Sequence, residues 1–584
     1  MKPRIWNRGD LRLLLVGLVF VLAWVAIGYR LFDLQGAKAQ ELAEVGFDQR
    51  IRQASIDAHR GTIYDRDGVE LAMTIDGWNV VVDPSMLDDP KATAIVLAPY
   101  ADTSLEELTE SLETGFDEGR RYAEISMAID TERKDEIKAV VEDHDIVGVF
   151  YRDQPIRVYP AGEIAAQVIG LTQTDDGAGL EGLERTFNSE LEGDAGSMIV
   201  ERDPYGRVIP QGEVRLRPAT AGADVVTTID REIQFTAEQG LRRAIQETSA
   251  SSGAIVAMDP NTGAILAMAS WPGLDLNDRS EISADVLQEA LRNPAAADIY
   301  EPGSTLKAVT VAAAIEEGIV TPSTPIDTPP SVVVGEFEYE DHGANPKWMS
   351  VGDVVKRSSN VGTIEIQRRL SNDLHYEYLT MFGLGSPSGL DVAGERHGQL
   401  NPASAWNQTS GSSIAIGYAV GTTPLQMAAV YSTIANDGVW TEPYLVSEII
   451  RADGTRIEPK HRTRPVLSYD TAATMRTLLG RVIEEEDGTG HRALMDDYTA
   501  GGKTGTSQKF DVDKQQYTED TTASFIGMAP LDDPQIVVVV LLDTPTGLLE
   551  DGTDLSLGGA SAAPVFAEVT QTALHQLGIA PDRG

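Results

Sequence analysis

Three short polar motifs in the C-terminal half of the chain hold the residue types that acyl transfer needs. They occur in the order Ser304-Thr305-Leu306-Lys307, Ser358-Ser359-Asn360 and Lys503-Thr504-Gly505. A serine hydroxyl becomes a nucleophile when a neighbouring base takes its proton, and a neutral lysine amine can be that base. Each motif alone is a weak signal, because S-x-x-K occurs by chance in most large proteins. Together and in this order, they predict covalent catalysis through a serine.

The first motif is predicted to lie at the start of a buried helix. Pro302-Gly303 precedes Ser304, mostly apolar residues follow as far as Ile315, and Gly318 marks the end. Residues three apart share a helix face, so Lys307 is expected beside the Ser304 hydroxyl. Burial disfavours the charged form of lysine, which leaves a neutral amine. The helix N-terminus also favours negative charge developing near the serine.

The third motif is predicted to be a short strand. Residues Ala500–Ser507 include three glycines, and glycine lets another backbone approach a strand closely. A peptide could pair along such an edge by strand addition, while side chains of the motif hold a carboxylate. A strand end followed by a turn is the plain alternative. The substrate-binding residues expected here are Lys503, Thr504, Gly505 and Thr506.

The second motif is ambiguous by itself. Serine and asparagine commonly cap helices or form turns, and that interpretation of Ser358-Ser359-Asn360 would prevail if the motif stood alone. Its position between the other two motifs favours a place in the same site. Ser358 is then expected to relay a proton, and Asn360 to hold a substrate amide or the lysine. The expected catalytic residues are Ser304, Lys307, Ser358 and Asn360.

Composition excludes several classes of function. The chain of 584 residues has no cysteine, so disulfides, thiolate chemistry and Cys-ligated metals are excluded. Its eight histidines show no metal-ligand spacing, and we expect neither a metal nor a cofactor. A net charge of −43 argues against nucleic acid as a partner.

An apolar segment near the N-terminus predicts a membrane anchor. Leu13–Tyr29 has no charged residue and would span roughly 26 Å as a helix, enough for a bilayer core. The basic residues before it place the N-terminus in the cytoplasm. Ala37-Lys38-Ala39 resembles a signal-peptide cleavage site, but charged and bulky residues separate it from the apolar run. We therefore predict an uncleaved single-pass anchor, with everything after it outside the cytoplasm.

The pattern of apolar residues predicts an α+β protein with two extracytoplasmic domains. We expect a cytoplasmic tail at 1–12, the anchor at 13–34, an elongated α+β pedestal at 35–218 and a catalytic domain at 219–584. In the pedestal, the acidic residues 103–145 are interpreted as solvated helices. The catalytic domain is expected to hold a central antiparallel sheet flanked by helices. Its predicted elements are the strands Asp224–Asp230, Gly253–Met258, Ala264–Ser270, Ala523–Ala529 and Gln535–Asp543, and helices at 231–247 and 562–577.

With these features the chain resembles the class B penicillin-binding proteins, which are monofunctional peptidoglycan transpeptidases. Arg60–Ala72 and Arg157–Glu184 look like turn segments of that family's membrane-proximal pedestal. Gly417–Met427 and Ala523–Gly527 look like parts of its catalytic domain. The exit from the membrane at Arg30–Gln35 and the chain length are most similar to the cell-division (septal) type. The elongation type is the close alternative.

The resemblance implies the reaction and the partners. Ser304 would attack the penultimate D-Ala carbonyl of a stem peptide ending in D-Ala-D-Ala, with Lys307 as general base and Ser358 as proton relay. The backbone N–H groups of Ser304 and Thr506 would hold the oxyanion. β-Lactam antibiotics would acylate the same serine. The expected membrane partners are a polytopic glycosyltransferase of the shape, elongation, division and sporulation (SEDS) family and other division proteins.

Three rival functions remain at this point. A β-lactamase needs a base that drives water into the acyl-enzyme, and Glu395 precedes Leu400-Asn401 at the wrong spacing for one known arrangement. A carboxypeptidase that releases D-Ala to water is possible, but the pedestal resembles transpeptidases. A non-catalytic division scaffold or antibiotic sensor disagrees with the complete set of motifs. A sensor would also be expected to have more membrane spans or a cytoplasmic output domain.

Overall fold

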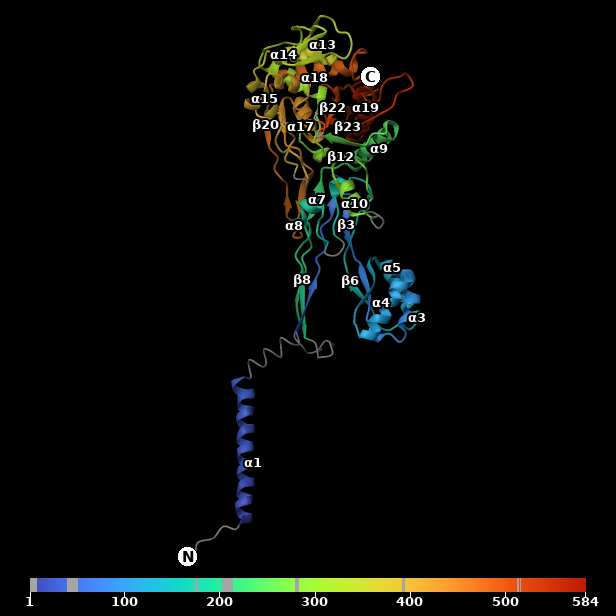
Figure 1. Ribbon diagram of the computed structural model, residues 1–584, viewed down its shortest axis with the longest axis vertical. Helices are drawn as coiled ribbons and strands as arrows, with labels where there is room; N and C mark the ends of the chain where they lie inside the picture. The colour runs from blue at the N-terminus through green and yellow to red at the C-terminus, as the bar shows by residue number, and fades with distance from the viewer. Residues whose placement is uncertain are drawn as a thin grey trace, which may run out of the picture. The chain divides into compact units, whose positions relative to one another are not determined.

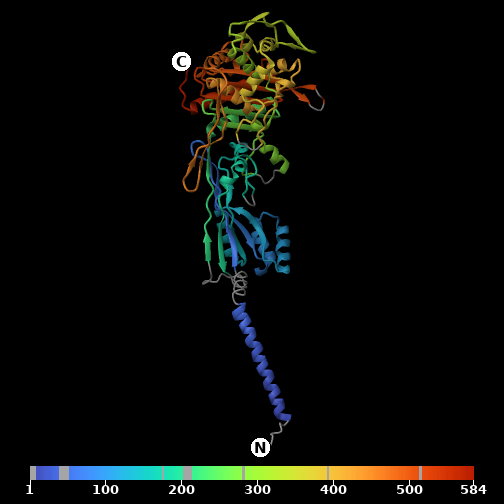
Figure 2. The same cartoon turned by 90° about the vertical axis from the view of Figure 1, so that its left-hand side faces the viewer.

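The computed structural model is shown in Figures 1 and 2 and describes residues 8–38, 51–173, 177–201, 214–278, 283–390, 394–511, 514 and 516–583. Contacts between residues divide the chain into two compact units. The first comprises Met1–His59 and Asp194–Ala221, and the second comprises Arg60–Gly193 and Gly222–Gly584.

The first unit contains the predicted apolar helix. Helix α1 (Arg8–Phe32) continues into a π-helical turn, η1 (Asp33–Ala37). Within the described residues, Leu11–Gly36 is the one helical stretch long and apolar enough to cross a membrane. The same unit holds an antiparallel three-stranded sheet in the order β1 (Ile51–Ile56), β8 (Gly196–Glu201) and β9 (Val214–Arg217).

The second unit begins with a small α/β lobe. Strands β5 (Ala123–Ile129), β4 (Trp78–Val82) and β6 (Val149–Asp153) form its sheet, and helices α3 (Pro90–Leu97), α4 (Leu105–Glu118) and α5 (Thr131–Asp143) pack together beside it (Figures 1 and 2). The interpretation of residues 103–145 as helices alone is wrong, because β5 separates α4 from α5. In β5 the side chains of Ile125 and Ile129 are buried while Glu124 is exposed. The high acidic content conceals this short strand in the sequence.

A six-stranded sheet joins the pedestal segments to the catalytic part of the same unit. Its order is β19 (Arg456–Ile457), β18 (Val446–Ile450), β10 (Asp224–Thr227), β2 (Ile63–Tyr64), β3 (Glu70–Ile75) and β7 (Ile156–Val158). Beside this sheet, Arg60 and Arg157 both bind the fully buried carboxylate of Glu184, at 2.6 and 2.7 Å. The two pedestal segments recognised in the sequence therefore interlock through a buried ion triad.

The catalytic part is built around a five-stranded antiparallel sheet, as the sequence predicts. Its order is β12 (Ile265–Trp271), β11 (Ser252–Met258), β23 (Ile536–Asp543), β22 (Gln516–Ala529) and β21 (Gly501–Asp511). Side chains alternate across a sheet. Val538 and Val540 accordingly pack in the core with α9 (Arg231–Thr248) and α19 (Gly558–Gln576), while Val537 and Val539 pack in the core that contains α17 (Pro424–Ala435) (Figure 1).

Further helices and short strands complete this part. The helices that bear on the motifs are α12 (Lys307–Glu316), α13 (Val351–Lys356), α14 (Asn360–Gln367) and α18 (Tyr469–Glu484). The remaining α-helices and strands of the second unit are α6 (Ala166–Ile169), α7 (Gly182–Thr186), α8 (Asn188–Leu191), α10 (Ala284–Leu291), α11 (Pro294–Ala297), α15 (Asn372–Met381), α16 (Ser410–Ala415), β13 (Pro325–Asp327), β14 (Ser331–Val334), β15 (Phe337–Glu340), β16 (Trp348–Ser350), β17 (Val439–Thr441) and β20 (Thr463–Pro465).

Candidate active site

Ser304 lies in a tight turn just before a buried helix. Residues Gly303–Leu306 form a 3₁₀ turn, and α12 begins at Lys307. The predicted turn into a buried helix is confirmed, with the difference that the first turn, which carries Ser304, has the 3₁₀ form. Gly303 has a φ of +54° and donates its N–H to the carbonyl of Gly417 (3.1 Å), which fixes the turn from outside. Ser304 is half-buried, directly before the start of a helix whose residues are all buried from Lys307 to Ala314.

Lys307 is buried as predicted, with 1% of its surface exposed. Its amine donates to the carbonyl of Ser358 (2.6 Å), to Oδ1 of Asn360 (2.7 Å) and to Oγ of Ser358 (3.3 Å). These bonds are directed at the second motif rather than at Ser304. Burial lowers the pKa of Lys307 to about 7, although the negative charge of Asp341 opposes the shift. A substantial fraction of this amine is therefore neutral near pH 7, as a general base requires.

The second motif forms the turn between α13 and α14. Ser358 has a φ of +58°, which is unusual for a residue with a side chain and costs conformational energy. Ser359 caps α14 by accepting the N–H of Gly362 (2.9 Å), so the capping interpretation is correct for this one residue. Asp341 holds the turn from the other side, accepting from Ser359 Oγ (2.7 Å) and from the N–H of Val361 (3.0 Å).

The third motif lies on the edge strand of the sheet and reaches the second motif. Lys503 is 1% exposed, and its amine donates to Ser358 Oγ at 2.7 Å. Burial lowers the pKa of Lys503 well below its ordinary value, and the charge of Lys307 lowers it further. The two amines therefore meet at one hydroxyl, that of Ser358. The structure brings all three motifs together, in the combination that the sequence predicts.

The glycines of this strand serve a purpose that the sequence interpretation did not foresee. A Cβ on Gly502 would lie 2.8 Å from the ring of Phe525, and one on Gly505 would lie 3.0 Å from the side chain of Thr305. These glycines thus admit the protein's own side chains and the turn that carries Ser304. Backbone also comes close, as predicted, because a Cβ on Gly502 would lie 2.7 Å from the carbonyl oxygen of Ile526 and one on Gly505 would lie 3.2 Å from that of Pro302. Pairing of a peptide substrate along this strand stays a prediction, and among the described strands the outer edge of β21 has no neighbour in its sheet.

Two further residues belong to the site and were missed. Thr489 accepts a hydrogen bond from Thr504 Oγ1 (3.2 Å), and Asp341 anchors the second motif. Neither lies in a recognisable motif, and each is far in sequence from the residue that it contacts. Thr506 Oγ1 accepts the N–H of Gly558 (3.2 Å), which leaves its hydroxyl hydrogen free to donate.

Comparisons with known proteins agree over nearly the whole chain. The penicillin binding protein transpeptidase domain family matches residues 253–571, and the penicillin-binding protein dimerisation domain family matches residues 55–227. The chain is 32% identical to stage V sporulation protein D of Bacillus subtilis, over 98% of this chain and 86% of that protein. It is 28% identical to the peptidoglycan D,D-transpeptidase FtsI of Escherichia coli, over 97% and 91% of the two chains.

Solved structures give the same result. Penicillin-binding protein 3 of Mycobacterium tuberculosis, in complex with aztreonam, superposes with a TM-score of 0.70 and 28% identity, over 90% of this chain and 98% of that one. The stretch matched by the transpeptidase family contains Ser304, Ser358 and Lys503.

Proposed function

Because this chain belongs to the class B penicillin-binding proteins, the peptidoglycan D,D-transpeptidases, we propose that Ser304 is the serine acylated in its reaction. The observation that carries this assignment is the meeting of Lys307 and Lys503 at Ser358 Oγ, at 3.3 and 2.7 Å. That meeting joins the three motifs into one polar centre at the end of α12.

Acylation of Ser304 is the first half of the reaction. Lys307, neutral in part near pH 7, takes the proton of Ser304 as Oγ attacks the penultimate D-Ala carbonyl carbon. The backbone N–H groups of Ser304 and Thr506 stabilise the oxyanion of the tetrahedral intermediate. The C–N bond then breaks, and Ser358 passes a proton to the departing D-Ala nitrogen. Asn360 keeps the lysine amine in position, since it accepts a hydrogen bond from that amine at 2.7 Å.

The transfer half restores the serine. An amine of a neighbouring stem attacks the acyl-enzyme carbonyl, the new amide forms, and Ser304 leaves with its proton regained. In both halves Lys503, Thr504 and Thr506 hold the terminal carboxylate, and Gly505 lets β21 lie close to the nucleophile turn. A β-lactam would bind through the same carboxylate contacts. Complexes of the tuberculosis homologue with aztreonam and ampicillin support binding of β-lactams.

The experiment that tests the assignment is mass spectrometry of the penicillin adduct. Full-length protein in detergent is treated with penicillin and digested, and the added mass is expected on the peptide that contains Ser304. Ser304→Ala should prevent the adduct, whereas Ser371→Ala, which removes an exposed cap of α15 outside the motifs, should retain it. An adduct on Ser358 would overturn the assignment of roles.

The organisation of the chain in the membrane is a further part of the proposal. Residues 13–34 would be a single-pass anchor with residues 1–12 in the cytoplasm, and residues 35–218 and 219–584 would be the pedestal and transpeptidase domains outside. The apolar length of α1 supports the anchor. The orientation rests on the basic residues that precede it. Protease protection of an N-terminal tag in intact spheroplasts tests it, and digestion of the tag from outside would refute it.

A septal role and SEDS-family partners complete the proposal. The similarity to FtsI supports a septal role, although a sporulation protein is also among the relatives of this chain. A fluorescent fusion should accumulate at division sites and co-purify with a SEDS glycosyltransferase. Uniform labelling of the lateral wall would favour the elongation role instead.

A further inference from the structure

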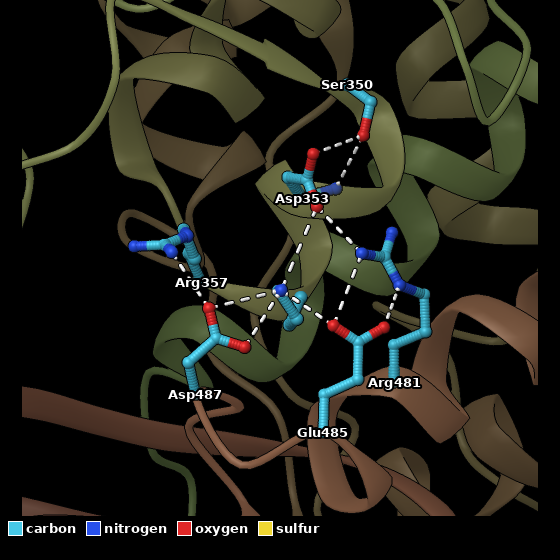
Figure 3. Close-up of polar contacts among 7 residues, drawn as sticks. Ser350, Asp353, Arg357, Arg481, Glu485 and Asp487 are labelled. Atoms are coloured by element: carbon cyan, nitrogen blue, oxygen red, sulfur yellow. Dashed lines mark hydrogen bonds and ion pairs between the residues drawn. The ribbon is translucent and has the colours of Figure 1, made fainter.

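Six charged side chains form a cluster between α13, the helix that precedes the second motif, and the end of α18 (Figure 3). Three are cationic and three are anionic: Lys356, Arg357, Arg481, Asp353, Glu485 and Asp487. Lys356 is the centre of the cluster, with 8% of its side chain exposed. Its amine donates to Glu485 Oε2 (2.7 Å) and Asp487 Oδ1 (2.9 Å) and lies 3.9 Å from Asp353 Oδ1.

The other two cations close the network around Lys356. Arg481 donates to Glu485 (2.6 Å) and Asp353 (2.7 Å), and Arg357 donates to Asp487 (2.8 Å). Figure 3 shows the carboxylates of Glu485 and Asp487 pointing toward α13. The network therefore fastens α13 to the end of α18 and to the loop that follows it.

The same short segment continues into the catalytic turn. Ser358 comes directly after Arg357, and its carbonyl and hydroxyl accept hydrogen bonds from Lys307 (2.6 Å) and Lys503 (2.7 Å) respectively. Its φ of +58° is a strained conformation for serine, and such conformations persist only where the surroundings hold them. Any movement of α13 would move both lysine contacts.

The loop on the other side of the cluster reaches the substrate strand. Two residues after Asp487, Thr489 accepts a hydrogen bond from Thr504 of the third motif (3.2 Å). One loop, residues 485–490, thus contacts both the segment before Ser358 and the strand of Lys503. The charged cluster therefore lies where the segment before Ser358 is joined to the loop that contacts the strand of Lys503.

We propose that Lys356 is a positioning residue for acylation, which with Glu485 and Asp487 holds the Ser358 turn at its working distance from the strand of Lys503 and Thr504. The inference rests on the proposed role of Ser304. The cluster is poorly suited to stabilising the fold alone, because every side chain in it except Lys356 is 29–51% exposed and exposed ion pairs contribute little to stability. Its value here is geometric, because it joins the helix that leads into Ser358 to the loop that contacts the strand of Lys503.

The test compares the acylation rate constant of full-length protein in detergent, followed with a fluorescent penicillin, with its melting temperature. Lys356→Met should lower the rate constant by roughly 10-fold to 100-fold, since a misplacement of about 1 Å can cost up to 10²-fold. Lys356→Arg should recover most of the rate, because a guanidinium can bond both carboxylates. The control is Asp551→Asn, which breaks an exposed pair with Arg492 (2.8 Å) outside the cluster and should leave the rate within about twofold.

A double variant separates positioning from charge balance. Lys356→Met with Asp487→Asn leaves two cations and two anions, but no tether between Lys356 and the loop. Positioning predicts that this variant stays slow, whereas recovery of the wild-type rate would assign the loss to the unbalanced charge of the cluster and overturn the proposal. If Lys356→Met does not fold, Asp487→Asn alone supplies the same test, because it weakens two of the bonds of Lys356.

A wild-type rate in folded Lys356→Met would equally overturn the inference. A wild-type protein that is not acylated at all would instead refute the proposed role of Ser304, so the two failures can be told apart.

Discussion

Substitution of Glu184 is expected to destabilise the pedestal more than any change on its surface. The carboxylate is fully buried and receives Arg60 Nε (2.6 Å) and Arg157 Nε (2.7 Å), and those two side chains are only 8% and 6% exposed. In Glu184→Gln the amide keeps one acceptor oxygen but turns an NH₂ group toward a guanidinium. Two buried cations then lose their shared counter-charge. Loss of one partner of a buried ion pair costs about 3–5 kcal/mol, and we expect a loss of this size.

Thermal unfolding of the full-length protein in detergent measures this effect. For a unit as large as Arg60–Gly193 with Gly222–Gly584, about 1 °C of apparent Tm corresponds to 1 kcal/mol, so we expect a fall of roughly 3–5 °C at a fixed scan rate. The control is Glu181→Gln in the same segment, which removes an exposed pair with Arg185 (3.5 Å) and should cost about 0.5 kcal/mol or less. Equal melting temperatures for the two variants would refute the view that the triad locks the pedestal segments together.

Three other predictions concern the catalytic base, the membrane anchor and the pedestal. Lys307→Arg keeps a positive charge but cannot supply a neutral amine near pH 7, so penicillin acylation should fall by at least roughly 10²-fold; near-normal acylation would contradict the base assignment. A chain starting near Gln35 should be soluble and still bind penicillin, whereas a mature N-terminus near Glu41 in native membranes would show that the segment is a cleaved signal. Deletion of residues 40–215 should abolish co-purification with a SEDS glycosyltransferase. Penicillin binding should fall only as far as the loss of β2, which pairs with β10, impairs folding. Continued co-purification would mean that the pedestal serves only as a spacer.

Local sequence patterns predict the strands and helices of the catalytic part well, because its core elements are strongly apolar. Ile536–Asp543 and Ser252–Met258 are buried on both faces of the sheet, and each is recognisable as a strand. The hairpin of β21 and β22 extends further than predicted, to Asp511 and from Gln516. This extension has no apolar periodicity in the sequence. Pairing between the two strands holds it extended, together with contacts of Tyr517 with the ring of Tyr418 and with Glu301 (3.2 Å).

Helix α19 shows how a tertiary contact changes a boundary. The sequence places its start at Ala562, since Gly558-Gly559 disfavours a helix. In the structure the helix begins at Gly558, where a Cβ would collide with the backbone of Gly505 and Ser524. Glycine is required there because the helix end packs directly on the catalytic strand.

The candidate site is predictable in its residue types but not in its supporting contacts. The residue types of the three motifs indicate their chemistry directly, so their assembly into one site could be predicted. Asp341, Thr489 and the cluster around Lys356 act through contacts between segments far apart in sequence, and the acidic residues 484–487 give no local sign of their partner. The 3₁₀ turn at Ser304 likewise depends on a hydrogen bond from Gly303 to Gly417.

The pH dependence of Ser304 acylation tests the central claim most directly. Burial holds the pKa of Lys307 at about 7, and only its neutral form accepts the serine proton. The acylation rate constant, measured by intact mass with a β-lactam between pH 5 and 9, should therefore rise through an apparent pKa of about 7 and level off above it. A rate that does not change with pH, or one that still rises tenfold per unit at pH 9 as for an ordinary lysine, would contradict the account.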